Sequence, residues 1–197
     1  MAGGVSADFR MSVPLKVSEI RDDKFDALRA IVERWEKKMR KHSDTVFKDG
    51  EDVASYIGHR LDHRDKIQVS EHILGCFAEK EGKESLEGIA FYTVQRDELY
   101  INYLAIAPRN IRHEVNKEKP GIKGIGSALI EKIVNVAKKR IVRVTAIGDS
   151  AEAFYLKQGF VRVSTEDPWK LSEFKMDKVA CDKTPTLPVD DAARRVA

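Results

Sequence analysis

The sequence has little cysteine and no segment of the kind that directs a chain out of the cell. Its 197 residues include two cysteines, Cys76 and Cys181, whose positions match no metal-binding or redox spacing. No apolar stretch of secretory type stands near the N-terminus. Because disulfide-rich proteins belong to oxidising compartments, these features predict a cytoplasmic protein.

Long apolar runs and an excess of one charge are also missing. No run approaches the roughly 20 apolar residues that cross a bilayer, so we expect a soluble protein with no membrane partner. The 35 Lys and Arg residues nearly balance the 32 Asp and Glu residues, which gives a formal net charge of +3. A dedicated nucleic-acid binder normally carries a strong basic excess on one face, so we expect no nucleic-acid partner.

The length of the chain suits one domain with a substantial core. Residues 1–11 read as a flexible leader, and residues 181–197 combine prolines and charges with little to bury, which predicts a flexible tail. We therefore expect a single domain over residues 12–180.

Apolar residues recur with two different periods along the chain. Spacings of three or four, as in Leu28, Val32 and Trp35, predict helices, and short apolar or alternating runs predict strands. Lys48, Asp49 and Gly50 interrupt the first helical pattern. The predicted order is β, α, α, β, β, β, α, β, α, β, β, with strands near 13–17, 73–78, 86–94, 99–106, 142–147, 160–163 and 174–179, and helices near 25–39, 53–61, 128–139 and 149–157.

The middle strands are joined by short polar connectors, which predicts an antiparallel meander. The run Leu99 to Ile106 is apolar on both faces and ends at Pro108, as expected of a central strand covered on both sides. The helical stripe that begins at Ile125 and the strand 142–147 complete a βαβ unit, which implies parallel pairing.

A glycine-rich stretch, Gly121-Ile-Lys-Gly124-Ile-Gly126-Ser127, opens the third predicted helix. Backbone N–H groups at a helix N-terminus are unpaired and aligned with the helix dipole, so the stretch predicts an anion site, above all for phosphate. A P-loop would need Gly-Lys-Ser/Thr at its end, which is absent. A dinucleotide fold would need the glycines in the opposite order and directly after the strand, although Asp149 imitates its ribose-binding acid.

Three stretches in this order resemble the GCN5-related N-acetyltransferase (GNAT) family: the strand end Leu104 to Pro108, the glycine stretch, and Ala151 to Phe160. The resemblance covers about residues 13 to 179. It implies an α/β fold with a mixed sheet of about six or seven strands and about four helices. The N-terminal half of that sheet is antiparallel, and the parallel strands four and five splay apart at a bulge.

The resemblance also implies that acetyl-CoA is the cosubstrate, with its pantetheine arm held by the main chain of the fourth strand and its pyrophosphate held by the glycine stretch. A pyrophosphate anion suits a helix N-terminus, and an extended amide-containing arm suits an opened strand edge. The cofactor-binding residues implied are Leu104, Ala105, Ile106, Gly121, Ile122, Lys123, Gly124, Ile125, Gly126, Ser127 and Tyr155.

The chain departs from the family pattern in two places. The family usually has Arg or Gln where this chain has Gly121, so no side chain contributes there. The turn over residues 109–119 is also longer than in the family, and this insertion carries Arg112, Lys117 and Lys119. These side chains are candidates to contact the coenzyme phosphates or an acidic acceptor, and a solvated basic loop is the simpler interpretation.

Tyr155 stands where the family commonly places its general acid. Its phenol and a thiol differ by roughly 1.5 pKa units, so full proton transfer to the leaving thiolate costs about 2 kcal/mol, and hydrogen bonding or late transfer is favoured. Packing on Phe154 and Phe160 is the structural alternative. Backbone N–H groups near Leu104 are candidates to stabilise the oxyanion.

The general base is less clear from the sequence. A lysine-like amine is neutral only about once in 2,500 molecules at pH 7, so a base should help. By alternation, Glu98, Tyr100, Asn102 and Leu104 share one face of the fourth strand. Glu98 is the acidic candidate, with a plain hairpin charge as the alternative.

We expect no metal, because His59 and His63 lie four apart on a helix without further ligands in the sequence, which is typical of a solvated face. The predicted function is acetyl-CoA-dependent N-acetyl transfer to a primary amine, by direct attack in a ternary complex. The acceptor is an amine-bearing small molecule or a protein or peptide, and a homodimer stays open. A non-catalytic acyl-CoA sensor or assembly module is the alternative, and a nucleotide-binding regulator ranks third.

Overall fold

The structure is a computed structural model that describes residues 13–63, 70–111, 121–138, 140–147, 149–164 and 171–176. The expected leader and tail lie outside these residues, as do Cys181 and the insertion residues Arg112, Lys117 and Lys119. Among the described helices, none combines the length and the apolar character that crossing a bilayer requires.

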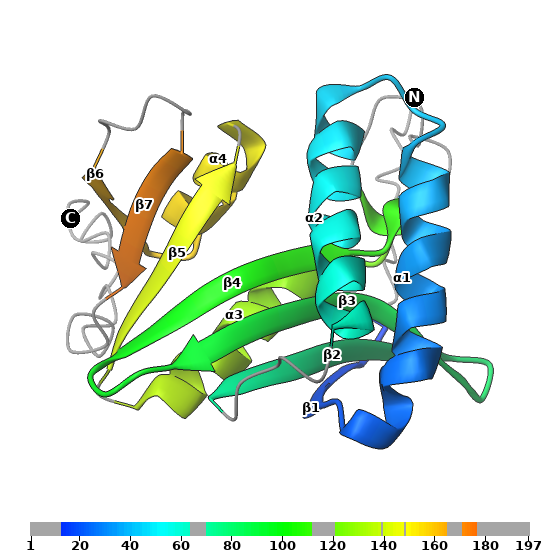
Figure 1. The fold of residues 1–197 in the computed structure, drawn as a ribbon, viewed down its shortest axis with the longest axis horizontal. Coiled ribbons are helices and arrows are strands. Elements are labelled where there is room, and N and C mark those ends of the chain that lie inside the picture. Colours follow the sequence, from blue (N-terminus) through cyan, green and yellow to red (C-terminus); the bar gives the residue numbers. More distant parts are fainter. Residues whose placement is uncertain are drawn as a thin grey trace, which may run out of the picture.

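A seven-stranded mixed sheet forms the centre of the fold (Figure 1). The strand order is β1-β2-β3-β4-β5-β7-β6, and β4 and β5 form the parallel pair. The expected fold class and element order are confirmed. The elements are β1 (Leu15–Glu19), α1 (Phe25–Met39), α2 (Thr45–Asp62), β2 (Glu71–Lys80), β3 (Lys83–Val94), β4 (Glu98–Ile106), α3 (Ile125–Ala137), β5 (Ile141–Ile147), α4 (Asp149–Lys157), β6 (Val161–Ser164) and β7 (Leu171–Met176), with short 3-10 helices at Asp22–Lys24 and Pro108–Asn110.

Two hydrophobic cores lie on opposite faces of this sheet. Helices α1 and α2 cover one face, and the predicted stripe of α1, including Leu28, Val32 and Trp35, is buried there. Helix α3 and Tyr155 of α4 pack on the other face. Both faces of β4 are covered: Leu99 and Ile101 are buried on the side of α3 and Ala105 on the side of α1 and α2, as its sequence indicated.

Helix α2 begins earlier than its sequence suggested. Asp44 caps it by accepting a hydrogen bond from the Val46 N–H at 2.9 Å, and the helix continues through Gly50. A Cβ atom at Gly50 would lie 2.8 Å from the sulfur of Met39 in α1. The expectation that residues 48–50 separate the two helices was therefore wrong, because Gly50 allows close helix packing and does not end a helix.

Two further boundaries differ from expectation. Strands β2 and β3 extend to a tight turn at Glu81 and Gly82, whose φ angles of 55° and 71° are those of a hairpin turn. Strand β7 begins at Leu171, three residues before the predicted start at Phe174. β7 pairs with β5 over Val142 to Ile147. The bounds of β7 therefore follow from its pairing with β5, which the apolar residues of the segment alone do not indicate.

A bulge at Asn102 in β4 controls the geometry of the site. Phe91 of β3 pairs with Tyr103 and Tyr92 pairs with Ile101, so Asn102 is left without a register partner. The alternation of side chains is shifted at this point. Ile101 and Leu104 both pack in the core with α3, whereas the predicted alternation put Leu104 on the face of Glu98 and Tyr100. That part of the expectation was wrong.

Candidate functional site

The parallel strands separate directly after the bulge. Strand β4 pairs with β5 only from Glu98 to Ile101, while β5 continues to Ile147 against β7. The backbone of β4 from Asn102 onward therefore turns an edge toward the gap. A splayed pair at strands four and five was expected from the resemblance, and the structure confirms it.

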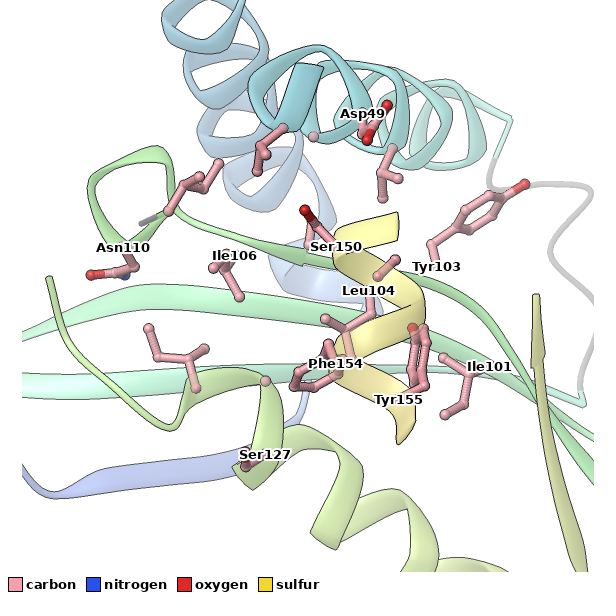
Figure 2. A pocket seen from close by; sticks show the side chains of 18 of the residues that line it. Asp49, Ile101, Tyr103, Leu104, Ile106, Asn110, Ser127, Ser150, Phe154 and Tyr155 are labelled. Atoms are coloured by element: carbon pink, nitrogen blue, oxygen red, sulfur yellow. The ribbon is translucent and has the colours of Figure 1, made fainter. Parts of the chain in front are cut away.

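A cavity of about 1040 Å³ occupies this separation (Figure 2). It is bounded by β4, β5, the part of α2 from Val46 to Tyr56, the length of α4 and the glycine stretch. The structure brings the predicted cofactor-binding residues to this one cavity, whereas Glu98 is not among those that line it. The predicted lining residues are Leu104, Ala105, Ile106, Gly121, Ile122, Lys123, Gly124, Ile125, Gly126, Ser127 and Tyr155.

The glycine stretch delivers an uncapped helix N-terminus to the cavity. Gly124 adopts a left-handed conformation with φ of 83°, and no side chain caps α3 at this position. The first helical bond of α3 runs from the Ala128 N–H to the Gly124 carbonyl at 2.8 Å. The N–H groups of Ile125, Gly126 and Ser127 precede that bond, so they have no acceptor within the helix.

Gly126 permits the close approach of α4 to this helix end. A Cβ atom at Gly126 would lie 2.9 Å from the ring of Phe154. Any larger residue would force Phe154 and the start of α3 apart. The glycine is therefore needed for packing as well as for access to the backbone.

A buried carboxylate, that of Glu87, fixes the entry to the glycine stretch. Glu87 is 1% exposed and is the residue of β3 that has no register partner where the pairing of β2 and β3 shifts. It accepts hydrogen bonds from Ser85 Oγ at 2.6 Å, from Asn110 Nδ2 at 2.7 Å and from the Arg109 guanidinium. Burial alone would raise the pKa of Glu87, but these donors outweigh it and the pKa is lowered, so the group stays ionised.

Asn110 connects Glu87 to the glycine stretch by hydrogen bonds to both. Its Oδ1 accepts a hydrogen bond from the Ile122 N–H at 2.8 Å. Gly121 fits directly against the same residue, because a Cβ atom there would lie 2.6 Å from the Arg109 carbonyl oxygen and 2.7 Å from the Asn110 Cα. The absence of the family's usual Arg or Gln at this position thus has a steric reason. The Ile122 N–H is engaged by Asn110, so in the glycine stretch it is the amides of Ile125, Gly126 and Ser127 that have no acceptor within the helix.

Tyr155 lies at the opposite end of the cavity, where α4 meets the sheet. Its side chain is 6% exposed and packs edge-on against Phe154 and Phe160, with ring centroids 5.2 Å and 5.4 Å away. Figure 2 shows the Tyr155 ring beside Ile101, with the hydroxyl at the level of Leu104. Burial raises the pKa of Tyr155, so the hydroxyl stays protonated over the ordinary pH range and can act as a hydrogen-bond donor.

Glu98 is tied into a polar cluster at the start of β4. Its carboxylate accepts hydrogen bonds from the Tyr100 hydroxyl and from Arg143 Nε, the latter at 2.7 Å. Together these hydrogen bonds lower the pKa of Glu98, with the bond from Tyr100 as the largest contribution. A carboxylate that holds its negative charge this firmly is a weak proton acceptor, which favours the structural interpretation of Glu98 over the catalytic one.

Asp49 is a cavity residue that the sequence analysis did not single out. It lies on α2 and is the only Asp or Glu lining the described part of the cavity (Figure 2). Burial, and then repulsion by Asp52, raises the pKa of Asp49. Because residues 48–50 were expected to break a helix, no signal in the sequence placed this side chain on a helix face toward the sheet.

The remaining candidates for chemistry have structural surroundings. His59 and His63 lie ring to ring, with centroids 4.2 Å apart, and His63 Nδ1 is 2.9 Å from the His59 carbonyl oxygen. In the described part of the chain, no three His, Cys, Asp or Glu side chains gather as a metal ion would require. Cys76 is fully buried, and burial raises the pKa of its thiol to about 11, which makes it a poor nucleophile.

Replacing Asn110 tests the anchoring of the glycine stretch. Asn110→Ala removes one donor from the buried Glu87 carboxylate and the acceptor of the Ile122 N–H, so the free energy of unfolding should fall by about 1–3 kcal/mol. Hydrogen exchange at the Ile122 amide should also accelerate. The exposed Asn135→Ala on α3 is the matched control and should change neither quantity appreciably. Unaltered exchange at Ile122 would contradict the proposed anchoring.

Replacing Asp49 tests whether its charge opposes folding. The raised pKa means that the folded state disfavours the ionised form, so the cost is absent below the unfolded pKa of about 3.8 and grows as pH rises through the folded value. Asp49→Asn should therefore stabilise the protein in urea unfolding at pH 7 and have little effect at pH 3. Asp97→Asn, in the turn before β4, is the control. Equal effects of Asp49→Asn at both pH values would contradict the prediction.

Comparison with known proteins gives a consistent result at the level of the fold. No protein-family model matches the sequence, and the search of curated proteins gives no match. Among solved structures, an acetyltransferase assigned to the GNAT family from Desulfovibrio desulfuricans is similar, with a TM-score of 0.56 and 14% identity over 83% of this chain and 99% of that one. The PaiA N-acetyltransferase of Thermoplasma acidophilum, solved with coenzyme A, gives a TM-score of 0.53 with 14% identity and the same coverage. A GNAT-family acetyltransferase of Streptococcus pneumoniae gives 0.51 with 17% identity, again over 83% and 99% of the two chains. The chain therefore has the fold of the GNAT acetyltransferases.

Proposed function

We propose that this protein transfers an acetyl group from acetyl-CoA to a primary amine by direct attack in a ternary complex. The observation that carries the proposal is the separation of β4 from β5 after Ile101, which opens one cavity between a strand edge, an uncapped helix N-terminus and a buried tyrosine. Similar folds occur in acetyltransferases, one of them solved with coenzyme A. These features together support coenzyme binding in the cavity.

The residues present suit the three parts of acetyl-CoA. The amides of Ile125 to Ser127 offer aligned donors for a pyrophosphate anion. The open edge of β4 at Leu104 to Ile106 offers backbone groups for an extended, amide-containing arm, as an added strand would use them. A cavity of about 1040 Å³ is at the upper end of the range for sites that bury a large ligand.

The bound coenzyme would supply a thioester, and the chain would supply the groups around it. Backbone N–H groups near Leu104 are the proposed donors to the oxyanion. The Tyr155 hydroxyl is the proposed donor to the departing sulfur, since burial keeps it protonated. Glu98, the base expected from the sequence, is hydrogen-bonded to Arg143 and Tyr100, which lowers its pKa, so the amine would lose its proton to water.

The low pKa of Glu98, which makes it a poor proton acceptor, supports a second candidate function, that of a non-catalytic acyl-CoA sensor. Such a module would keep the cradle and the strand edge without moving a proton. The two functions differ in one measurable result, the release of free coenzyme thiol in the presence of an amine.

Binding at the helix N-terminus is tested by a charge placed in the first turn of α3. Ser127→Asp adds a negative charge that favours the helix dipole but repels a pyrophosphate, so the free energy of unfolding should hold while affinity for CoA falls at least about tenfold. Asn135→Asp, on the exposed side of the same helix, is the matched control. Calorimetric titration with CoA, acetyl-CoA and NAD measures the effect. Tighter binding of NAD than of acetyl-CoA would contradict the proposal.

Turnover is tested by thiol release from acetyl-CoA over a panel of amines, and the role of the tyrosine is tested by Tyr155→Phe. Loss of one donor at the sulfur should lower kcat by about tenfold or more and leave the KM for acetyl-CoA within about twofold. No inflection from Tyr155 is expected below about pH 10, because its pKa is raised. Unchanged kcat across the pH range would remove Tyr155 from the mechanism. Binding without thiol release from any amine would favour the sensor.

A further inference from the structure

A second cavity, of about 510 Å³, adjoins the first at the bulge in β4. The two cavities share residues from the facing parts of β4 and β5, namely Ile101, Asn102, Tyr103, Val144 and Thr145. The second cavity is otherwise bounded by the ends of α2 and β3 and the start of β2. A molecule in it would lie next to the point where the strands part.

Each described charged group that lines the second cavity has an ion-pair partner, and the partner of Arg143, Glu98, lies outside the lining. Arg60 is ion-paired with Glu71, and Arg143 with Glu98 at a distance of 2.7 Å. The low pKa of Glu98 keeps the second pair ionised. The described walls therefore carry the cations Arg60 and Arg143 and one carboxylate, that of Glu71, which is paired with Arg60, so a polycationic amine meets no uncompensated carboxylate there.

The neutral lining is rich in hydroxyl and amide groups. Thr93, Gln95, Asn102 and Thr145 contribute such groups, and Asn102 Nδ2 donates a hydrogen bond to Thr93 Oγ1 at 2.6 Å. That bond occupies one of the two amide donors of Asn102, whose side chain also carries a carbonyl acceptor. Asn102 and Gln95 are exposed, so this lining continues to the surface and leaves room for a ligand longer than the cavity.

Asp49 lines the main cavity and is not among the described residues that line the second one. It lies eleven residues before Arg60 on α2, a separation of about 16 Å along the helix axis. Glu98 does not line the second cavity, and Glu71, the one carboxylate among its described lining residues, is paired with Arg60, so these residues give little help in removing a proton. The basicity of the acceptor amine then becomes decisive.

Two kinds of protein amine differ strongly in this respect. A lysine side chain, with a pKa of about 10.4, is neutral about once in 2,500 molecules at pH 7, whereas an α-amino group, with a pKa of about 7.7–8.0, is neutral about once in eight. At pH 7 and without a base, the fraction of an α-amine in the neutral, nucleophilic form is thus about 300 times that of a lysine side chain. Its neighbouring peptide groups also match a neutral lining of amides and hydroxyls.

We propose that the second cavity binds the N-terminal residues of a peptide and that the acceptor is its α-amino group, an inference that rests on the proposed acetyl transfer. The amine nitrogen forms the bond to the acetyl carbon as the carbon–sulfur bond breaks. The nitrogen loses one proton to solvent, and the thiolate gains one. The products are an N-acetylated peptide and free CoA.

The test compares four amines at equal concentration with acetyl-CoA and the full chain. They are a lysine-free hexapeptide with a free α-amine, the same peptide with a blocked α-amine and an added lysine, spermidine, and glucosamine. Thiol release and the mass of the product are measured. The free α-amine peptide should give a kcat/KM at least tenfold above the others, and faster reaction of any other amine would overturn the inference while leaving acetyl transfer in place.

The location of the acceptor is tested by Thr93→Val, which keeps the shape of the residue and removes its hydroxyl. The KM for the peptide should rise about threefold to tenfold, and the KM for acetyl-CoA should stay unchanged. Thr45→Val, at the exposed start of α2, makes the same chemical change away from the cavity and should alter neither. An unchanged peptide KM in Thr93→Val would overturn the location. Thiol release from none of the four amines while CoA still binds would overturn acetyl transfer and this inference together.

Discussion

The hydrogen-bonded ladder between β4 and β5 ends at Ile101 and Val144, and the candidate site depends on that ending. If the ladder continued, β4 would have no open edge toward the main cavity. The bulge at Asn102 stands at the end of the ladder and turns Leu104 toward α3. One extra residue in one strand therefore sets the location of the gap and the side chains that face it.

The two ends of the main cavity rely on different physical interactions. At the glycine end, backbone donors are left uncapped, and the polar groups of Glu87 and Asn110 hold the approaching chain in place. At the tyrosine end, the Tyr155 hydroxyl lies among apolar side chains, which keeps it protonated. A pyrophosphate and a departing thiolate both need hydrogen-bond donors, and the cavity offers backbone N–H groups at one end and a phenol hydroxyl at the other.

The sequence was sufficient to predict the element order, the parallel pair and the residues of the glycine stretch, because these depend on local periodicity and on turn chemistry. It was insufficient for features that depend on contacts between distant segments. Gly50 reads as a helix breaker until Met39 is seen to pack against it. The misplaced start of α2 then concealed Asp49, and an alternation without the bulge put Leu104 on the wrong face.

Glu87 and Asn110 also have a consequence for how this protein can vary. Arg109 and Asn110 on one side of residues 112–120, and Gly121 and Ile122 on the other, are held together by the same buried carboxylate and carboxamide. Both ends of the intervening segment are thus fixed by contacts outside it. The start of α3 is therefore held by Glu87 and Asn110, which lie outside residues 112–120. Changes in the sequence of residues 112–120 should therefore leave the glycine stretch in its place at the cavity.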